Sequence, residues 1–195
     1  MKQNNSLLFV AITLIIVAFA RLADHPFNFT PLAAMALFGV YYMKNKWFAF
    51  LLPLLAIMFS DVLVNLFVQN EHTGVWEYFL NPTAYVVYGS LMLVGSLGLL
   101  MKNTKATSIM GFSILGSLLF YLVTNTAAWV TDFGNLYSND LSGLVQSLWA
   151  GIPFYNNEIT GSFFLNQLAG DLFFNALLFG SYALASKRIR LFQTA

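Results

Sequence analysis

The sequence predicts an all-α integral membrane protein, a single domain over residues 1–195 with six transmembrane helices and one short helix outside the membrane. Three observations predict this class: the composition, six apolar stretches and the placement of the charged residues. Of the 195 residues, 58% are hydrophobic and 9% are charged, against roughly 25% charged residues in a soluble domain. Because so few polar side chains cannot cover a surface in water, we expect membrane lipid to surround most of the chain.

The six apolar stretches are separated by short polar segments. A bilayer core needs about 20 apolar residues per helix, and at about 1.5 Å per residue the second stretch reaches only roughly 20 Å. The fourth stretch begins with Asn81 as its N-cap and Pro82 at its first helical position. We expect helices at about residues 6–23, 31–43, 47–68, 81–101, 107–130 and 162–186.

The first stretch has a second interpretation. Lys2, the apolar run that follows it and the small residues Ala18 and Ala20 around Phe19 also resemble a signal peptide with its cleavage site. Two features argue against a signal peptide. The basic region before the apolar run has a single lysine, and the apolar run continues to Ala23. Whether residues 1–20 are removed stays open at this point.

The basic residues predict the orientation of the helices, because cytoplasmic loops collect Lys and Arg. With the N-terminus inside, only Arg21 of the nine basic residues lies at an outer helix end, and no acidic residue lies in an inner loop. We therefore expect both termini in the cytoplasm. The inner basic residues are then Lys2, Lys44, Lys46, Lys102, Lys105, Lys187, Arg188 and Arg190.

The outer connection between the fifth and sixth helices, residues 131–161, contains an amphipathic pattern. Apolar residues recur there at helical spacing between Ser138 and Gly151, and Pro153 follows. We expect a short helix that either braces the bundle as a lid or lies in the membrane interface. The apolar positions are Leu141, Leu144, Val145, Leu148 and Trp149.

Two acidic residues, Asp61 and Asp171, fall inside predicted membrane helices. On insertion scales each costs about 2.5–3.5 kcal/mol, and such residues mark functional sites by default. Asn65 and Asn175 each follow an aspartate by four residues, and Gln167 precedes Asp171 by four, so each acid shares a helix face with an amide. At 1.5 Å per residue both acids lie roughly 12–14 Å below the outer surface.

These polar residues predict an outward-facing binding pocket for a small solute. The aromatic residues of the outer loops and adjoining helix ends suit a ring-containing solute, and an interfacial aromatic belt is the alternative explanation for them. The fifth helix adds Asn125 and Trp129 at a similar depth, and Arg21 lies near the mouth. The second helix, too short to span, is tolerable only beside protein or a water-filled cavity. The alternative is that the polar groups only hold helices together, with Arg21 neutralising one aspartate. The candidate substrate-binding residues are Arg21, Asp61, Asn65, Asn125, Trp129, Asp171 and Asn175.

The residues argue against an enzyme and against a cofactor. The chain has no cysteine, no histidine cluster for a metal, no Ser-His-Asp arrangement and no glycine-rich phosphate loop with lysine. A net charge of +1 gives no basic excess to bind nucleic acid. We therefore expect recognition of a small-molecule substrate, with no catalytic residue, metal or cofactor.

The segment over residues 21–65 resembles an uncharacterised bacterial family described as transport proteins. That family is in turn similar to the substrate-binding S components of energy-coupling-factor (ECF) vitamin transporters. The resemblance rests on Arg21, Pro26, Asn28, Phe29, Thr30, Pro31, Ala34, Ala36, Leu37, Phe38, Gly39, Pro53, Ser60 and Asp61.

The resemblance implies uptake of a vitamin or its precursor across the bacterial inner membrane. It implies six helices, an outward pocket under the first, third and fifth loops, and a transmembrane coupling protein with ATPase subunits as partner. One departure is that Ala11, Ala18, Ala20 and Ala23 never fall four residues apart, whereas S components carry Ala-x-x-x-Ala in the first helix. A solitary proton-coupled carrier and a non-transport scaffold or assembly protein therefore stay as alternatives.

Overall fold

The computed structural model describes residues 3–23, 25–69, 79, 81–131, 135–153 and 162–193. Within these ranges the elements are helical and no strand occurs. Seven α-helices are described. A 3₁₀ turn (η1, Ala20–Leu22) follows α1, and a π-helical turn (η2, Asn65–Gln69) follows α3. The α-helices are α1 (Gln3–Phe19), α2 (Leu32–Tyr42), α3 (Lys46–Val64), α5 (Pro82–Leu97), α6 (Ala106–Val130), α7 (Leu141–Ala150) and α8 (Phe163–Gln193).

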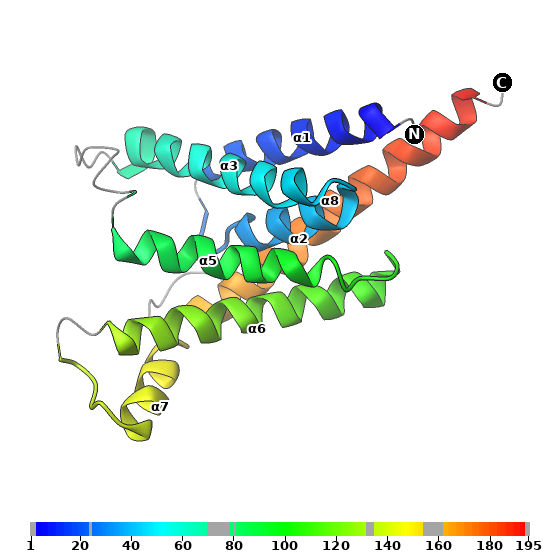
Figure 1. Cartoon of the computed structure of the whole chain (residues 1–195). Helices are drawn as coiled ribbons and strands as arrows, with labels where there is room; N and C mark the ends of the chain where they lie inside the picture. Colours follow the sequence, from blue (N-terminus) through cyan, green and yellow to red (C-terminus); the bar gives the residue numbers. More distant parts are fainter. Residues whose placement is uncertain are drawn as a thin grey trace.

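The long helices form one elongated bundle (Figure 1). The beginning of α1 and the end of α8 lie at one end of the bundle, and α7 lies at the other, which we call the α7 end. α2 lies inside the bundle and packs against α1, α3, α5, α6 and α8. The expectation of an all-helical bundle with a short second helix and a separate amphipathic helix is therefore confirmed.

Three of the described helices are long and apolar enough to cross a membrane: Trp47–Phe67, Ala106–Val130 and Phe163–Lys187. Three apolar helices are shorter, at Leu8–Leu22, Leu32–Tyr42 and Pro82–Leu97. This count is lower than the predicted six transmembrane helices, of which only the second was expected to be short. α5 is shorter than expected because it ends at Leu97, where Gly98 begins a turn, rather than near Met101.

α2 is buried along most of its length because small residues let its neighbours approach. Every residue from Ala33 to Val40 is buried. A Cβ atom on Gly39 would lie 2.3 Å from Cγ of Pro53 in α3, and a Cβ atom on Gly98 would lie 2.8 Å from the carbonyl oxygen of Leu37. Close backbone contact through small residues is the packing that stabilises helices in lipid.

α7 confirms the amphipathic helix predicted after residue 138, and its orientation distinguishes between the two interpretations of it. Asp140 caps its N-terminus by accepting a hydrogen bond from the Gly143 amide at 2.9 Å. Ser147 faces α6, where its hydroxyl donates to the Asn125 carbonyl, and Gly143 packs on the Ser138 backbone. The apolar positions Leu141, Val145 and Trp149 stay exposed. This orientation favours the membrane-interface interpretation over a lid that turns its apolar face inward.

Candidate functional site

The first polar group connects η1, α3 and α5 around Asp61. The Arg21 guanidinium forms an ion pair with Oδ1 of Asp61 and donates to the Ser60 hydroxyl at 2.6 Å. The Tyr88 hydroxyl donates to Oδ2 of Asp61 at 2.7 Å. Asp61 is 4% exposed and the Arg21 side chain 11%, so the pair is largely removed from solvent. Arg21 therefore neutralises Asp61, as the alternative interpretation of these polar groups expected.

Two polar atoms of this first group have no hydrogen-bond partner among the described residues: Nε of Arg21 and Oδ1 of Asn65. Asn65 is 3% exposed and lies one turn after Asp61, where α3 changes into the π-helical turn η2. One donor and one acceptor are thus left unsatisfied inside the first group.

The second polar group lies between α6 and α8 around Asp171. Ser117 donates its hydroxyl to Oδ2 of Asp171 at 2.6 Å, and Nε2 of Gln167 donates to the Ser117 carbonyl at 3.2 Å. Asp171 is 2% exposed. Asn175, one turn further along α8, is 1% exposed, and its Oδ1 has no hydrogen-bond partner among the described residues.

The segment before α2 covers the second group on the side of the α7 end. Nδ2 of Asn28 donates to the Phe163 carbonyl at 3.2 Å and to Oε1 of Gln167 at 3.3 Å. Asn28 has a φ of 63°, a left-handed conformation that asparagine tolerates better than most residues. A Cβ atom on Gly170 would lie 3.1 Å from the Thr30 nitrogen, so Gly170 allows this segment to lie directly on α8.

The third polar group joins α6 to α7. Nδ2 of Asn125 donates to the carbonyl of Tyr121 in its own helix at 2.9 Å, and the carbonyl of Asn125 accepts from the Ser147 hydroxyl at 2.9 Å. The Trp129 indole donates to the Ser138 carbonyl at 2.9 Å. These bonds hold α7 against the end of α6, so in this structure Asn125 and Trp129 serve the attachment of α7.

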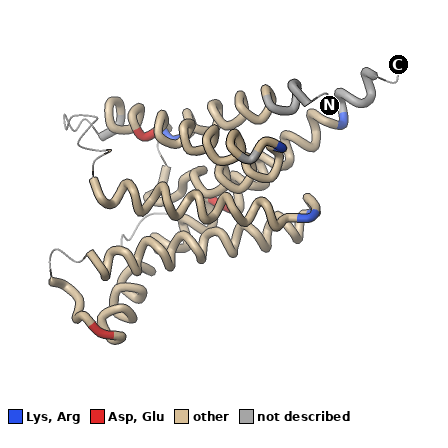
Figure 2. The backbone as a smooth tube through the Cα atoms, in the orientation of Figure 1, with Lys and Arg blue, Asp and Glu red and all other residues tan. Residues whose placement is uncertain are grey.

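The structure thus places the seven candidate residues in three groups with different partners. Figure 2 shows how few charged positions the described bundle contains. A single pocket was expected because the seven residues lie at a similar depth along their helices. The face that each helix presents to its neighbours also decides which side chains meet. The groups are Arg21, Asp61 and Asn65, then Asp171 and Asn175, then Asn125 and Trp129.

A cavity of about 320 Å³ lies between the N-terminal half of α5 and the C-terminal part of α6, at the α7 end. Its volume falls within the usual range of small-molecule sites, about 300–1,000 Å³. None of the seven candidate residues lines it. The lining residues are Pro82, Thr83, Val86, Val87, Thr124, Ala127, Ala128, Thr131, Leu136 and Tyr137.

Sequence patterns did not predict this cavity, because its lining carries no buried charge. Threonine and alanine at these positions are ordinary in a membrane helix, and their spacing alone does not tell a cavity from a packed contact. The one available signal was the recurrence of Thr124, Ala127, Ala128 and Thr131 at helical spacing along one face of α6.

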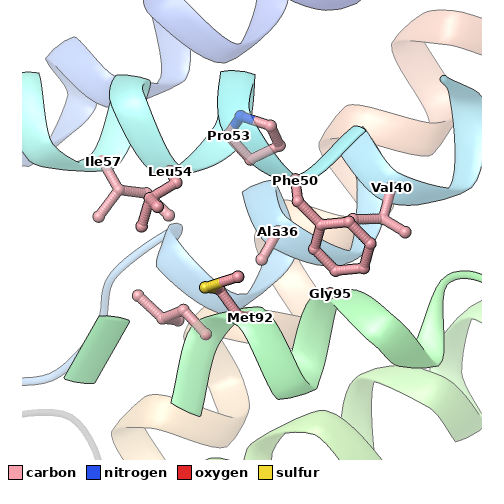
Figure 3. Close-up of a pocket in the computed structure, with 9 residues that line it drawn as sticks. Ala36, Val40, Phe50, Pro53, Leu54, Ile57, Met92 and Gly95 are labelled. Atoms are coloured by element: carbon pink, nitrogen blue, oxygen red, sulfur yellow. The ribbon is translucent and has the colours of Figure 1, made fainter. Parts of the chain in front are cut away.

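A second gap, between α3 and α5 with α2 behind it, is too small for a solute (Figure 3). Its volume is about 10 Å³, which is at the lower limit for a single water molecule. Phe50, Val40 and Met92 line it, so the gap is apolar.

A family model described as "Family of unknown function (DUF6580)" matches residues 1–193 of the chain. Comparisons with curated proteins and with solved structures give no match. Among the described residues, no three His, Cys, Asp or Glu side chains are grouped to hold a metal ion.

Proposed function

We propose that this chain, which belongs to the DUF6580 family of unknown function, is a membrane transport protein that binds a small neutral solute for uptake. The observation that carries the proposal is the cavity of about 320 Å³ at the α7 end. Small-molecule sites are mostly apolar with a few polar groups that orient the ligand. Here valine, alanine, proline and leucine side chains form most of the lining, and Tyr137 offers an aromatic ring.

The hydroxyl groups of the lining indicate which solute fits. Thr131 donates its hydroxyl to the Ala127 carbonyl at 2.8 Å, and Thr124 donates to the Phe120 carbonyl at 2.9 Å. With their hydrogens engaged in the helix, these oxygens have only lone pairs left to offer. A solute with N–H or O–H donors and a planar ring suits them, and the absence of charge from the lining residues favours a neutral molecule.

The proposed topology follows the loop charges. Six passages, three of them by the shorter helices α1, α2 and α5, place both termini in the cytoplasm and the α7 end outside. The positions of the two helix ends in Figure 1 agree with an even number of passages. In a bacterial inner membrane the cavity then faces the external solution, which is the orientation that uptake requires.

The short central helix supports transport over a passive role. At about 1.5 Å per residue the 11 residues of α2 reach roughly 17 Å, well short of the hydrocarbon thickness of about 30 Å. The irregular residues before it lie against α8 through Asn28 and Gly170. Short and interrupted helices are a feature of transporters, although none of the α2 residues lines the cavity.

The resemblance to ECF S components agrees with this proposal in one specific respect. It implies a pocket under the fifth loop, and Leu136 and Tyr137 of that connection line the cavity. By the same resemblance, a transmembrane coupling protein with ATPase subunits supplies the energy. A proton gradient is the alternative source for a solitary carrier.

A scaffold or assembly role is the competing function. The bonds of Asp61 and Asp171 to side chains of neighbouring helices favour it, since such bonds hold helices together in lipid. A scaffold, however, gains nothing from an unfilled cavity, whereas a binding protein needs one. Filling the cavity therefore separates the two functions.

Ligand-induced thermal stabilisation tests the proposal, because a molecule that binds only the folded state must raise the unfolding temperature. We expect at least one neutral vitamin or precursor to raise the Tm of the purified chain. Ala127→Phe, which fills the cavity, should abolish that rise, and Ala106→Phe at the exposed start of α6 should preserve it. Equal stabilisation of both variants would show that the cavity is not the site.

A further inference from the structure

The charges inside the described bundle do not balance at Asp171. Asp61 has Arg21 as its counter-ion, but the other basic side chains that the structure describes, Lys44, Lys102, Lys105 and Lys187, are exposed. Asp171 is 2% exposed and accepts a hydrogen bond from a neutral serine. A buried carboxylate without a counter-charge is strongly unfavourable.

The hydrogen-bonding neighbours of Asp171 bring no charge. The Ser117 hydroxyl, 2.6 Å away, is neutral, and so is Gln167 one turn earlier in α8. An ionised Asp171 therefore needs a positive charge that no described side chain supplies.

Asn175 provides an independent indication at the same place. Its Oδ1 is a buried acceptor without a partner among the described residues, on a side chain that is 1% exposed. Residues four apart lie on one face of a helix, so Asn175 shares the face of α8 on which Asp171 meets α6. Burying an acceptor without a partner costs about as much as a lost hydrogen bond, and a bound cation would remove that cost.

Further polar residues lie near the contact between α6 and α8. α6 and α8 run antiparallel, with Tyr121 packed on Phe164 at 4.7 Å between ring centroids and Ser117 bonded to Asp171. Asn175 follows Asp171 by one turn of α8, Ser113 precedes Ser117 by one turn of α6, and both side chains are buried. Amide and hydroxyl groups thus lie within one turn of the contact between Ser117 and Asp171.

We infer that Asp171, Asn175 and Ser117 form an intramembrane binding site for a monovalent metal cation, with Na⁺ as the ion that these oxygens suit. Hard cations take oxygen ligands such as carboxylate and amide oxygens. A single carboxylate balances one positive charge, whereas a divalent ion would leave a net charge buried. This site is separate from the solute cavity, whose lining contains none of the three residues.

Thermal unfolding of the purified full-length chain in NaCl and in choline chloride of equal ionic strength tests this site. We expect the Tm to rise with Na⁺ concentration and to saturate. The rise should disappear in Asp171→Asn and in Asn175→Leu, and it should shrink in Ser117→Ala. The matched control is Ser90→Ala, a buried serine of α5 whose hydroxyl bonds only to the Val86 carbonyl of its own helix in the structure, and it should keep the full rise.

Equilibrium dialysis of the wild-type chain against ²²Na⁺ keeps the test independent of how well the variants fold. Saturable binding of about one ion per chain supports the site. Equal Tm values in NaCl and choline chloride together with no retained ²²Na⁺ would overturn it. So would a Tm that responds to pH but not to Na⁺, since a proton would then neutralise Asp171, and so would an unchanged Na⁺ response in a folded Asp171→Asn chain.

Discussion

Arg21 and Asp61, forty residues apart in the sequence, form an ion pair inside the bundle that ties η1 to α3. Tyr88 adds α5 to the same carboxylate through a hydrogen bond of 2.7 Å. The pair therefore fixes the relative position of three elements at one point. Because both partners are largely buried, its loss has a larger effect than the loss of a surface ion pair.

Arg21→Met should destabilise the protein by about 3–5 kcal/mol, because it leaves the Asp61 charge buried without a counter-ion. The measurement is reversible unfolding of the purified chain in detergent. In the double variant Arg21→Met with Asp61→Leu, most of the lost stability should return, since no buried charge remains. A single variant as stable as the wild type would show that the ion pair does not hold η1 against α3.

Gly39→Ala should destabilise the bundle by about 1–3 kcal/mol through overpacking. The added methyl group would meet Cγ of Pro53 at 2.3 Å, and α2 would have to move away from α3. The control is Gly89→Ala in α5, where a Cβ atom meets nothing within 4 Å and helix propensity favours alanine by about 0.5–1 kcal/mol. Equal unfolding free energies for the two variants would contradict the described contact of α2 with α3.

The N-terminus of α7 should lose stability when the pH falls from about 4 towards 2. Hydrogen bonds lower the pKa of Asp140 from 3.8 to about 2. The largest effect comes from the hydroxyl of Ser138, followed by the amide of Gly143 and the hydroxyl of Ser142. Because the folded-state pKa is the lower one, the stabilising contribution is fully present above pH 4 and disappears as Asp140 becomes protonated in the folded state.

Amide hydrogen exchange of α7, corrected for the intrinsic effect of pH, measures this loss. Asp140→Asn is the matched variant, because asparagine also caps helices well but does not titrate. Protection of α7 in that variant should change little between pH 4 and pH 2. An identical pH dependence in the wild type and the variant would exclude Asp140 as the titrating group.

The sequence predicted the features that rest on strong local or energetic signals. Asn81 and Pro82 fixed the start of α5, as expected. The heptad-like apolar pattern located α7, which spans Leu141–Ala150. The insertion cost of Asp61 required a partner, and the structure confirms Arg21.

The grouping of the polar residues could not be predicted in the same way. Depth along a helix follows from residue number, whereas the rotation of one helix against another depends on packing of small residues from distant segments. Gly39 against Pro53 is one such contact, and Gly170 against Thr30 is another. In the packed bundle Asp61 meets η1 and α5, whereas Asp171 meets α6.

Uptake of isotope-labelled small metabolites by right-side-out membrane vesicles tests the proposed function most directly, because vesicles from the producing cells retain any coupling partner. Vesicles that contain the wild-type chain or Ala106→Phe should accumulate at least one neutral, donor-bearing metabolite. Vesicles with equal amounts of Ala127→Phe should not accumulate it. The same accumulation profile in wild-type vesicles, Ala127→Phe vesicles and vesicles without the chain would contradict solute uptake through the cavity at the α7 end.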